Sequence, residues 1–358
     1  MADPVMTGSQ TTWKRKVIRC LLLAAAALIL TGIGTYPDLT ETIRNNILRS
    51  LDPVPEDRWI TFHGSGERFI MCGSVLYTAE PGKICAYSRG GKLLFEQQTN
   101  LQDPVLKACG STVLAYDPGK TTLYCLNHKA CKAVEVLSGI LTASPGPDGC
   151  FAVTTAGSGY YTAVLEYPAD GSDPIRSGFV DCVVADLIYL DDGRLLMSCV
   201  SPDGAWSLRL SGAVIPLDPA LVLDMAPQQN GFAVWTDEGV LFFDENGQIT
   251  DSMPGEGIDW ACGDRTALLL YDNCGFRLRI KGDNSSYSDT DRLPHRPLKL
   301  TVCEEYVCLL DRQCLLIYDE KGALRGNYPF GAGASKILTW ANSLLLIGPE
   351  RLLCHWIL

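Results

Sequence analysis

The chain has 358 residues, and 47% of them are hydrophobic, so it can bury a large core in one or two domains. Its formal net charge at neutral pH is -11. Because phosphate binding needs a concentrated basic face, this excess of negative charge argues against DNA or RNA as a partner.

A basic cluster stands directly before an apolar run near the N-terminus. Lys14–Lys16 and Arg19 precede Cys20–Ile33. With Val17 included, the apolar stretch spans roughly seventeen residues, the lower limit for a helix that crosses the hydrocarbon core. Because positive flanks stay in the cytoplasm, we expect residues 1–16 to be cytoplasmic, residues 17–36 to form one transmembrane helix, and the rest to lie outside. The expected membrane-anchoring residues are Arg19, Cys20, Leu21, Leu22, Leu23, Ile29, Leu30 and Ile33.

The aliphatic part of this run is interrupted near its end. Positions 29 and 30 are isoleucine and then leucine, and position 31 is not a leucine but the polar residue Thr31. Position 31 therefore contributes no anchoring side chain, and Ile33 is the last of the expected anchoring residues.

Two other interpretations of this segment remain open. A cleaved signal peptide has the same charged-then-apolar layout, but the small-residue pattern Gly32-Ile-Gly34 is a poor cleavage site. A buried core helix is the second alternative. We favour the uncleaved anchor, which makes this a single-pass protein of the cell membrane.

The segment 37–57 predicts a short amphipathic helix and a linker. Leu39, Ile43, Ile47 and Leu51 recur every four residues and form one apolar stripe. The proline-rich stretch 52–57 then forms a stiff connection to the remaining residues.

Residues 58–358 contain short apolar runs with a period near forty residues, which is typical of propeller blades. Each unit pairs two strand-like runs across a turn. The expected turns are His63–Gly66, Gly110–Thr112, Pro145–Gly149, Asp191–Gly193, Gln228–Gly231, Gly263–Arg265, Glu304–Glu305 and Ala341–Ser343. Asp-Gly and Asn-Gly favour such hairpins because they accept positive φ. We expect an all-β fold, a β-propeller of about eight (seven to eight) four-stranded blades, with a β-sandwich as the alternative.

Three stretches carry a family resemblance. Lys83–Phe95, Val240–Gly247 and Leu315–Gly322 each join an apolar strand, an aromatic residue and a glycine turn. This pattern resembles the repeats of pyrroloquinoline-quinone-type (PQQ-like) β-propellers, and the layout resembles uncharacterised bacterial membrane-anchored propellers of unknown function. The signatures of WD40 repeats are missing. The resemblance would imply a quinone and a calcium ion in the ring, but this chain lacks the adjacent cysteines and long insertions of those enzymes. We therefore expect no cofactor.

The two acidic turns of this pattern are interpreted as structural joints. Asp244 with Gly247, and Asp319 with Gly322, recur at the same place in two units. We expect them to shape hairpins, with no role in a site. The last unit ends at its third strand, 351–358, so we expect a closing blade of three strands.

The cysteines leave two alternatives for a chain placed outside the cell. Fifteen are present, and many lie in apolar runs, among them Cys72, Cys199 and Cys308. Either several are bridged, or free thiols persist in an organism that lives without oxygen. We favour free thiols, because cysteines inside strands are poorly placed for bridging.

No catalytic or metal-binding motif emerges. The four histidines lack ligand spacing, and the carboxylate pairs Asp191-Asp192 and Glu304-Glu305 fall in turns. Ser201–Trp206 is one residue short of a sialidase Asp box and is interpreted as a hairpin. We expect no catalytic, cofactor-binding or metal-binding residues.

The predicted function is binding. A membrane-tethered propeller would act as a scaffold for an envelope protein, a peptide or a glycan, with loops as the recognition surface. The connections 170–177 and 282–297 are the longest and are candidates for partner contact. The alternative is an exported hydrolase or lyase with an active site at the channel mouth.

Overall fold

The structure is a computed structural model, and its described residues all belong to the second of the chain's two units, Glu56–Leu358. They are residues 59–61, 68–88, 92–127, 131–157, 161–217, 220–282, 286–293, 295–312, 314–329, 334, 336–340, 343–347 and 351–356. The predicted transmembrane helix, with Arg19 to Ile33, and the predicted amphipathic helix lie outside this set. Within it, no helix is long and apolar enough to cross a membrane.

The described residues form eight four-stranded antiparallel sheets, here called blades 1 to 8. Blade 1 consists of β2 (Arg68–Cys72), β3 (Val75–Glu80), β4 (Lys83–Ser88) and β5 (Leu93–Gln98). Blade 2 consists of β6 (Val105–Cys109), β7 (Thr112–Tyr116), β8 (Thr122–Leu126) and β9 (Cys131–Glu135). Blade 3 consists of β10 (Ile140–Pro145), β11 (Phe151–Ala156), β12 (Thr162–Tyr167) and β13 (Arg176–Val180). Blade 4 consists of β14 (Val183–Tyr189), β15 (Leu195–Val200), β16 (Trp206–Leu210) and β17 (Ala213–Pro216). Blade 5 consists of β18 (Val222–Gln228), β19 (Gly231–Thr236), β20 (Gly239–Asp244) and β21 (Ile249–Pro254). Blade 6 consists of β22 (Gly257–Cys262), β23 (Thr266–Asp272), β24 (Gly275–Lys281) and β25 (Tyr287–Asp289). Blade 7 consists of β26 (Lys299–Cys303), β27 (Tyr306–Leu310), β28 (Cys314–Tyr318) and β29 (Leu324–Pro329). Blade 8 is β30 (Lys336–Trp340), β31 (Ser343–Ile347), β32 (Arg351–Trp356) and β1 (Trp59–Thr61), and a 3-10 turn, η1 (Pro147–Gly149), joins β10 to β11.

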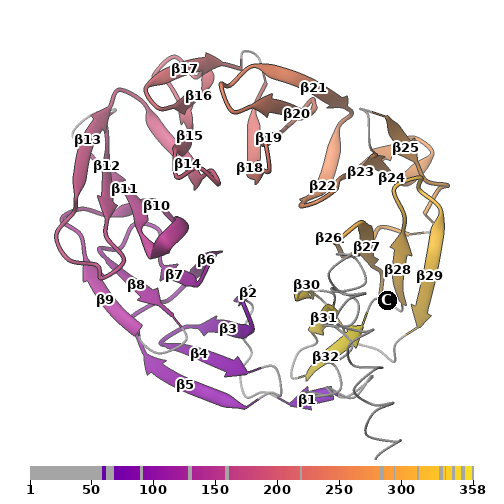
Figure 1. Ribbon diagram of the computed structural model, residues 1–358, viewed down its shortest axis with the longest axis horizontal. Coiled ribbons are helices and arrows are strands. Elements are labelled where there is room, and N and C mark those ends of the chain that lie inside the picture. The colour runs from indigo at the N-terminus through magenta and orange to yellow at the C-terminus, as the bar shows by residue number, and fades with distance from the viewer. Residues whose placement is uncertain are drawn as a thin grey trace, which may run out of the picture. The chain divides into compact units, whose positions relative to one another are not determined.

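These blades are arranged in a ring, with the first strand of each blade innermost (Figure 1). Each blade is a simple meander in which consecutive strands pair, and β30 of the last blade contacts β2 of the first. Radial repetition of this kind leaves only short outer edges. The predicted all-β propeller is therefore confirmed.

The closing blade corrects one prediction. β32 does not end the last sheet, because β1 pairs with it antiparallel, with Trp59 opposite Leu353 and Thr61 opposite Arg351. The missing fourth strand thus comes from the start of the ring. The three-strand expectation rests on the helical and proline-rich pattern of the residues before Trp59, and the three residues of β1 are too few to show a strand pattern in the sequence.

The first blade corrects another prediction. Its first turn lies at Gly73-Ser74, between β2 and β3, whereas the predicted turn His63–Gly66 precedes β2 and lies outside the described residues. Gly73 has a φ of +57°, which a glycine adopts at little cost. Because apolar residues flank the turn on both sides, the run 68–77 reads as one strand in the sequence.

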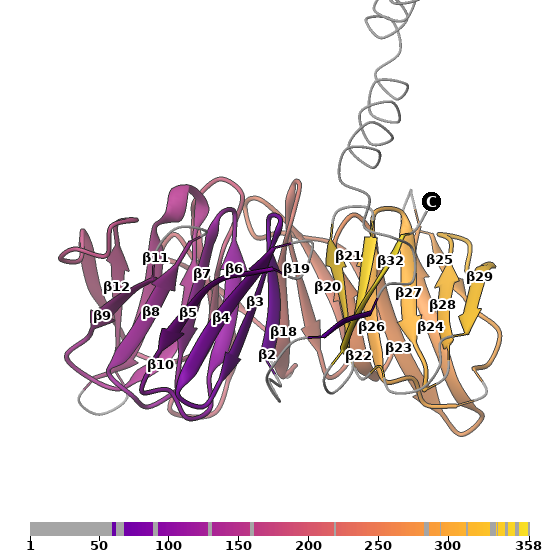
Figure 2. The ribbon, with the colours of Figure 1, turned by 90° about the horizontal axis from the view of Figure 1, so that it is seen from below.

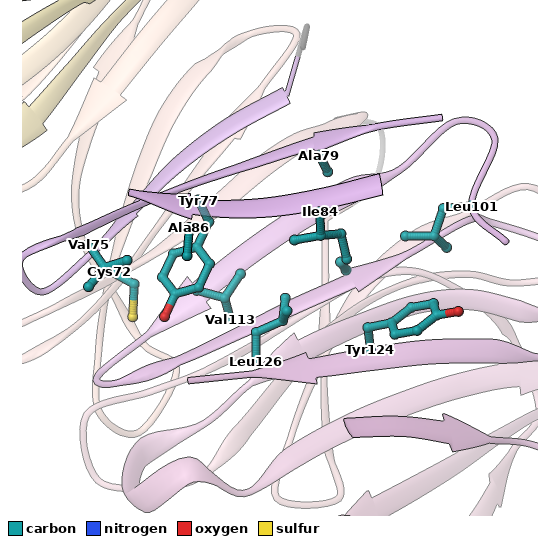
Figure 3. Close-up of a cluster of buried hydrophobic side chains, with 11 residues drawn as sticks. Cys72, Val75, Tyr77, Ala79, Ile84, Ala86, Leu101, Val113, Tyr124 and Leu126 are labelled. Carbon is teal, nitrogen blue, oxygen red and sulfur yellow. The ribbon is translucent and has the colours of Figure 1, made fainter. Parts of the chain in front are cut away.

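The hydrophobic core lies between neighbouring blades. Figure 3 shows Tyr77 and Ile84 of blade 1 pointing toward Val113 and Leu126 of blade 2, and all four side chains are buried. Burying one large apolar side chain stabilises a fold by roughly 1.5–3 kcal/mol. The ring is therefore held by its blade-to-blade contacts.

Several of the described cysteines form part of this core, and the described cysteines that lie in it are free thiols. Cys72, Cys85, Cys199 and Cys308 are buried on strands. Burial raises the pKa of each of these thiols above its ordinary value, so each stays protonated at neutral pH.

The antiparallel strands give the ring two distinct faces (Figure 2). The turns after the first and third strands of each blade lie on one face, here called the hairpin face. The turns after the second strands and the blade-to-blade connections lie on the other, here called the linker face. Each innermost strand therefore begins at the linker face and ends at the hairpin face.

Candidate binding surfaces of the ring

Four consecutive innermost strands share a local irregularity near the linker face. The pairing register shifts between Ile140 and Thr142 in β10 and between Val184 and Asp186 in β14. It also shifts between Val222 and Asp224 in β18 and between Gly257 and Asp259 in β22. A bulge of this kind re-aims the residues around it. In each strand the residue after the bulge is polar: Thr142, Asp186, Asp224 and Asp259.

Three of the polar residues on inner strands form one network across three blades. The Nζ atom of Lys107, on β6, forms an ion pair with Asp186, on β14, and donates a hydrogen bond to Oγ1 of Thr142 at 3.3 Å. Thr142, on β10, donates to Oδ1 of Asp186 at 3.0 Å. Because each partner comes from a different blade, this network links blades 2, 3 and 4 through their innermost strands.

Asp224 continues the polar layer in blade 5. Its Oδ2 accepts a hydrogen bond from Nε1 of Trp260 in blade 6 at 2.8 Å, and its Oδ1 accepts one from the amide of Met225 at 2.8 Å. Although part of Asp224 remains exposed, the surrounding protein displaces much of its water, and this desolvation raises the pKa of its carboxyl group. The bond from Trp260 opposes the rise, and the negative charge of Asp186 adds to it.

Asp259 and Lys299 extend the layer to blades 6 and 7. Nζ of Lys299 donates to Oδ1 of Asp259 at 2.8 Å, and the amide of Leu300 donates to Oδ2 at 3.2 Å. Around this arc, two of the three aspartates therefore have a lysine partner. Of these three aspartates, only Asp224 accepts its hydrogen bonds from described donors that are all neutral.

An apolar collar lies beside this polar layer at the linker face. It consists of large aliphatic side chains at, or directly before, the starts of inner strands, and each exposes 37–44% of its surface. The members of the collar are Leu141, Val183, Leu221, Leu223, Ile258 and Leu298. Large exposed apolar side chains that gather at one end of a fold are candidates for an interaction surface.

The hairpin face carries a different surface, a groove of about 910 Å³ over blades 5, 6 and 7. The turn Gln228–Asn230 of blade 5 and the turn 263–265 of blade 6 form its sides. Lys281 and Glu305 border it from blades 6 and 7. A smaller hollow of about 340 Å³ shares Glu305 and continues along blade 7.

The two repeated acidic turns lie on the same hairpin face and have the same geometry. Oδ1 of Asp244 accepts hydrogen bonds from the amides of Asn246 at 2.9 Å and Gln248 at 2.8 Å. Oδ1 of Asp319 accepts from Lys321 and Ala323, both at 2.9 Å. Gly247 and Gly322 follow with φ values of +80° and +73°. Asp244 also borders the groove, and Asp319 borders the smaller hollow. Each acidic turn therefore forms part of the rim of one of these two depressions.

The other sequence candidates lie apart from one another. Asp191-Asp192 and Glu304-Glu305 occupy the turns before β15 and β27, and Asp192 is engaged by Nε of Arg194 at 2.6 Å. Of the stretch Ser201–Trp206, residues 201–205 form the turn between β15 and β16, and Trp206 begins β16. The connection 282–297 is shorter than the sequence suggests, because β25 lies inside it. No group of metal-binding side chains gathers in the part of the chain that the structure describes.

Sequence reasoning missed the polar layer. Lys107, Asp186, Asp224, Asp259 and Lys299 are single charges on strands that are otherwise mostly apolar. The usable signal is the recurring order of two apolar residues and then a charge, as in Val105-Leu-Lys107 and Val222-Leu-Asp224. Their assembly into one layer depends on closure of the ring.

The comparisons with known proteins concern the fold. No protein-family model matches the chain, and no curated protein matches its sequence. Among solved structures, BamB from Moraxella catarrhalis is similar with a TM-score of 0.58 and 11% identity, covering 84% of this chain and 99% of that chain. Sqt1 from Saccharomyces cerevisiae is similar with a TM-score of 0.57 and 12% identity, covering 84% and 97%. Apo AztD from Citrobacter koseri follows with 0.52 and 12%, covering 74% and 86%.

At these identities the likeness shows the β-propeller fold alone. BamB and Sqt1 match this chain over nearly their whole length. The resemblance to PQQ-like repeats and to membrane-anchored propellers stays a prediction about the family.

Proposed function

We propose that this protein is a membrane-tethered propeller that lies outside the cytoplasm and binds a protein partner, an envelope protein or a peptide, at the linker-face mouth of its channel. The observation that carries the proposal is the apolar collar. Six large aliphatic side chains from five blades remain exposed at or beside the starts of the innermost strands, whereas Val214, Ile249 and Leu324 are exposed on outer strands of the same blades. Covering such a patch with a partner's apolar side chains is favourable.

The chemistry of the collar favours a polypeptide over a glycan. Its members Leu141, Leu223 and Ile258 are aliphatic, whereas sugar recognition commonly relies on flat aromatic faces. The polar layer beside the collar offers the carboxyl group of Asp224 to a donor on the partner. A partner segment with leucine-like side chains around one polar or basic group fits this surface.

The rival function, an exported hydrolase or lyase, is favoured by one observation. Asp224 interacts electrostatically with Asp186 of the neighbouring blade, and desolvation raises the pKa of the Asp224 carboxyl group, a shift that suits a general acid. However, Asp186 is engaged by Lys107 and Thr142, and both oxygens of Asp224 accept hydrogen bonds. We therefore rank catalysis second.

Affinity capture from the membranes of the organism that produces the chain tests the proposal. The full-length protein is immobilised beside Leu223→Glu and Ile258→Glu variants, with Leu324→Glu as the control. Leu324 is also exposed but lies on the outer strand of blade 7. We expect one protein to be retained by the wild type and the control and to be lost from both collar variants. Equal retention by all four would contradict the collar as the binding surface.

Accessibility tests the tether and the location. An external protease applied to intact cells should degrade the chain beyond residue 36, which lies at the end of the predicted anchor. Full protection in intact cells, with degradation after lysis, would contradict the extracytoplasmic placement.

A further inference from the structure

The groove on the hairpin face is lined by primary amides from one turn. Nε2 of Gln228 donates to Oγ1 of Thr266 at 3.1 Å and to Sγ of Cys262 at 3.4 Å, which fixes the turn against blade 6. Gln229 and Asn230 are exposed, and neither side chain has a hydrogen-bond partner among the described residues. A primary amide offers both donors and an acceptor, and an extended peptide backbone presents both in alternation.

The basic side chains of the groove are already neutralised. Nζ of Lys281 lies 3.0 Å from Oδ2 of Asp251, and a guanidinium nitrogen of Arg265 lies 3.0 Å from Oε2 of Glu320. Lys281, Asp251 and Arg265 are largely buried, and Glu320 is partly exposed. They therefore add little net charge to the groove.

The acidic side chains of the groove are not balanced in this way. Asp244, Asp264 and Glu305 all border it, and no ion pair engages them among the described residues. Hydrogen bonds from backbone amides, led by that of Gln248, hold the pKa of Asp244 below its ordinary value, so its carboxylate persists at neutral pH. The groove is thus complementary to a cationic ligand.

The aromatic residues of the groove argue against a sugar. Phe242 and Phe243 are only 2% and 3% exposed. The ammonium group of Lys281 lies 3.3 Å from the centre of the Phe242 ring, so it covers that face. No flat aromatic surface in the described lining is left for stacking.

We infer that the hairpin-face groove binds an extended peptide segment that carries lysine or arginine side chains. The segment lies along blades 5, 6 and 7. Its backbone bonds to Gln229 and Asn230, and its cations pair with Asp264 and Glu305. This site lies on the face opposite the collar, so the ring can hold two partners at once and join them.

Fluorescence anisotropy with the full-length chain in detergent tests this site. The probe is a fluorescein-labelled peptide of alternating lysine and threonine, and the reference is the matching glutamate–threonine peptide. We expect saturable binding of the lysine peptide alone. The Asp264→Lys/Glu305→Lys variant should raise its Kd at least about tenfold, because it reverses both charges at the site. The Gln229→Ala/Asn230→Ala variant should raise the Kd roughly fivefold, through lost hydrogen bonds.

A charge-matched control separates the groove from the overall field of this acidic protein. Asp173→Lys/Glu256→Lys makes the same change in net charge at two exposed positions outside the groove. It should change the Kd less than about twofold. Equal weakening by the two charge-reversed variants, or an unchanged Kd in the amide variant, would overturn the proposal. Leu223→Glu should leave peptide binding intact, so failure at the groove and failure at the collar are distinguishable.

Discussion

Trp260 donates a hydrogen bond from Nε1 to Oδ2 of Asp224 over 2.8 Å, across the boundary between blades 6 and 5. The neighbouring Trp235, on blade 5, has its ring centre 6.1 Å from that of Trp260. Its own Nε1 is buried and has no hydrogen-bond partner among the described residues. Two adjacent indoles therefore share one packing site and differ in whether they bond to a carboxyl group.

This difference predicts unequal costs for two matched substitutions. Trp260→Phe removes a donor from Asp224, whereas Trp235→Phe removes an unpaired donor. Both lose similar ring volume. Hydrogen bonds to charged groups contribute about 1.5–3 kcal/mol. Trp260→Phe should lower the free energy of unfolding by about that much more than Trp235→Phe, as measured by denaturant titration. Equal losses would show that packing alone matters here.

The raised pKa of Asp224 predicts a pH dependence. The folded state binds the proton of this group more tightly than the unfolded state does, so the stabilising effect is complete below the unfolded-state pKa. It is lost as pH rises through the folded-state pKa. Asp224→Asn removes this titration. The melting temperature of the wild type, relative to that of Asp224→Asn, should fall as pH rises from about 3.5 upward. A difference that stays constant across this range would contradict the assignment.

Substitution of the glycine in a repeated acidic turn should lower the stability of the fold and leave partner binding unchanged. Gly322 has a φ of +73°, and a β-branched residue resists this conformation. Gly322→Val should lower the free energy of unfolding by roughly 1–3 kcal/mol and leave partner capture intact at a temperature where the variant is folded. Gly178→Val is the control, because Gly178 lies on β13 with open space around its Cα and without a positive φ. A Gly322→Val variant with an unchanged melting temperature and lost binding would show that the turn is a site.

The ion pairs of the channel wall predict a contrast between two lysines. Lys107 and Asp186 are 25% and 30% exposed, whereas the side chain of Lys299 is 48% exposed beside Asp259. Lys107→Met leaves a half-buried carboxylate without its cation and should cost roughly 1–3 kcal/mol of unfolding free energy. Lys299→Met should cost less than about 1 kcal/mol, because water screens an exposed pair. Thermal unfolding of both variants checks this order, and a larger loss in Lys299→Met would contradict it.

The sequence predicts the repeat because turns are local. Asp191–Gly193 and Gln228–Gly231 form hairpins through their own residues, so their spacing fixes the number and position of the sheets. The same local chemistry explains why Asp244 and Asp319 share one geometry.

The remaining features depend on contacts between distant parts of the chain. β1 is a strand only because β32, almost three hundred residues later, pairs with it. Lys107 meets Asp186 only when blades 2, 3 and 4 stand side by side. The collar likewise arises where bulges expose Leu223 and Ile258, which in the sequence look like ordinary core residues.

Site-specific photocrosslinking tests the binding role of the collar most directly. A photoreactive phenylalanine analogue replaces Leu223 in the full-length chain in its own membranes, and the same analogue replaces Leu324 as the control. We predict one discrete crosslinked protein from position 223, absent from position 324 and abolished when Ile258→Glu is added. A product of the same size from both positions, or one from position 223 that survives Ile258→Glu, would contradict a partner bound at the channel mouth.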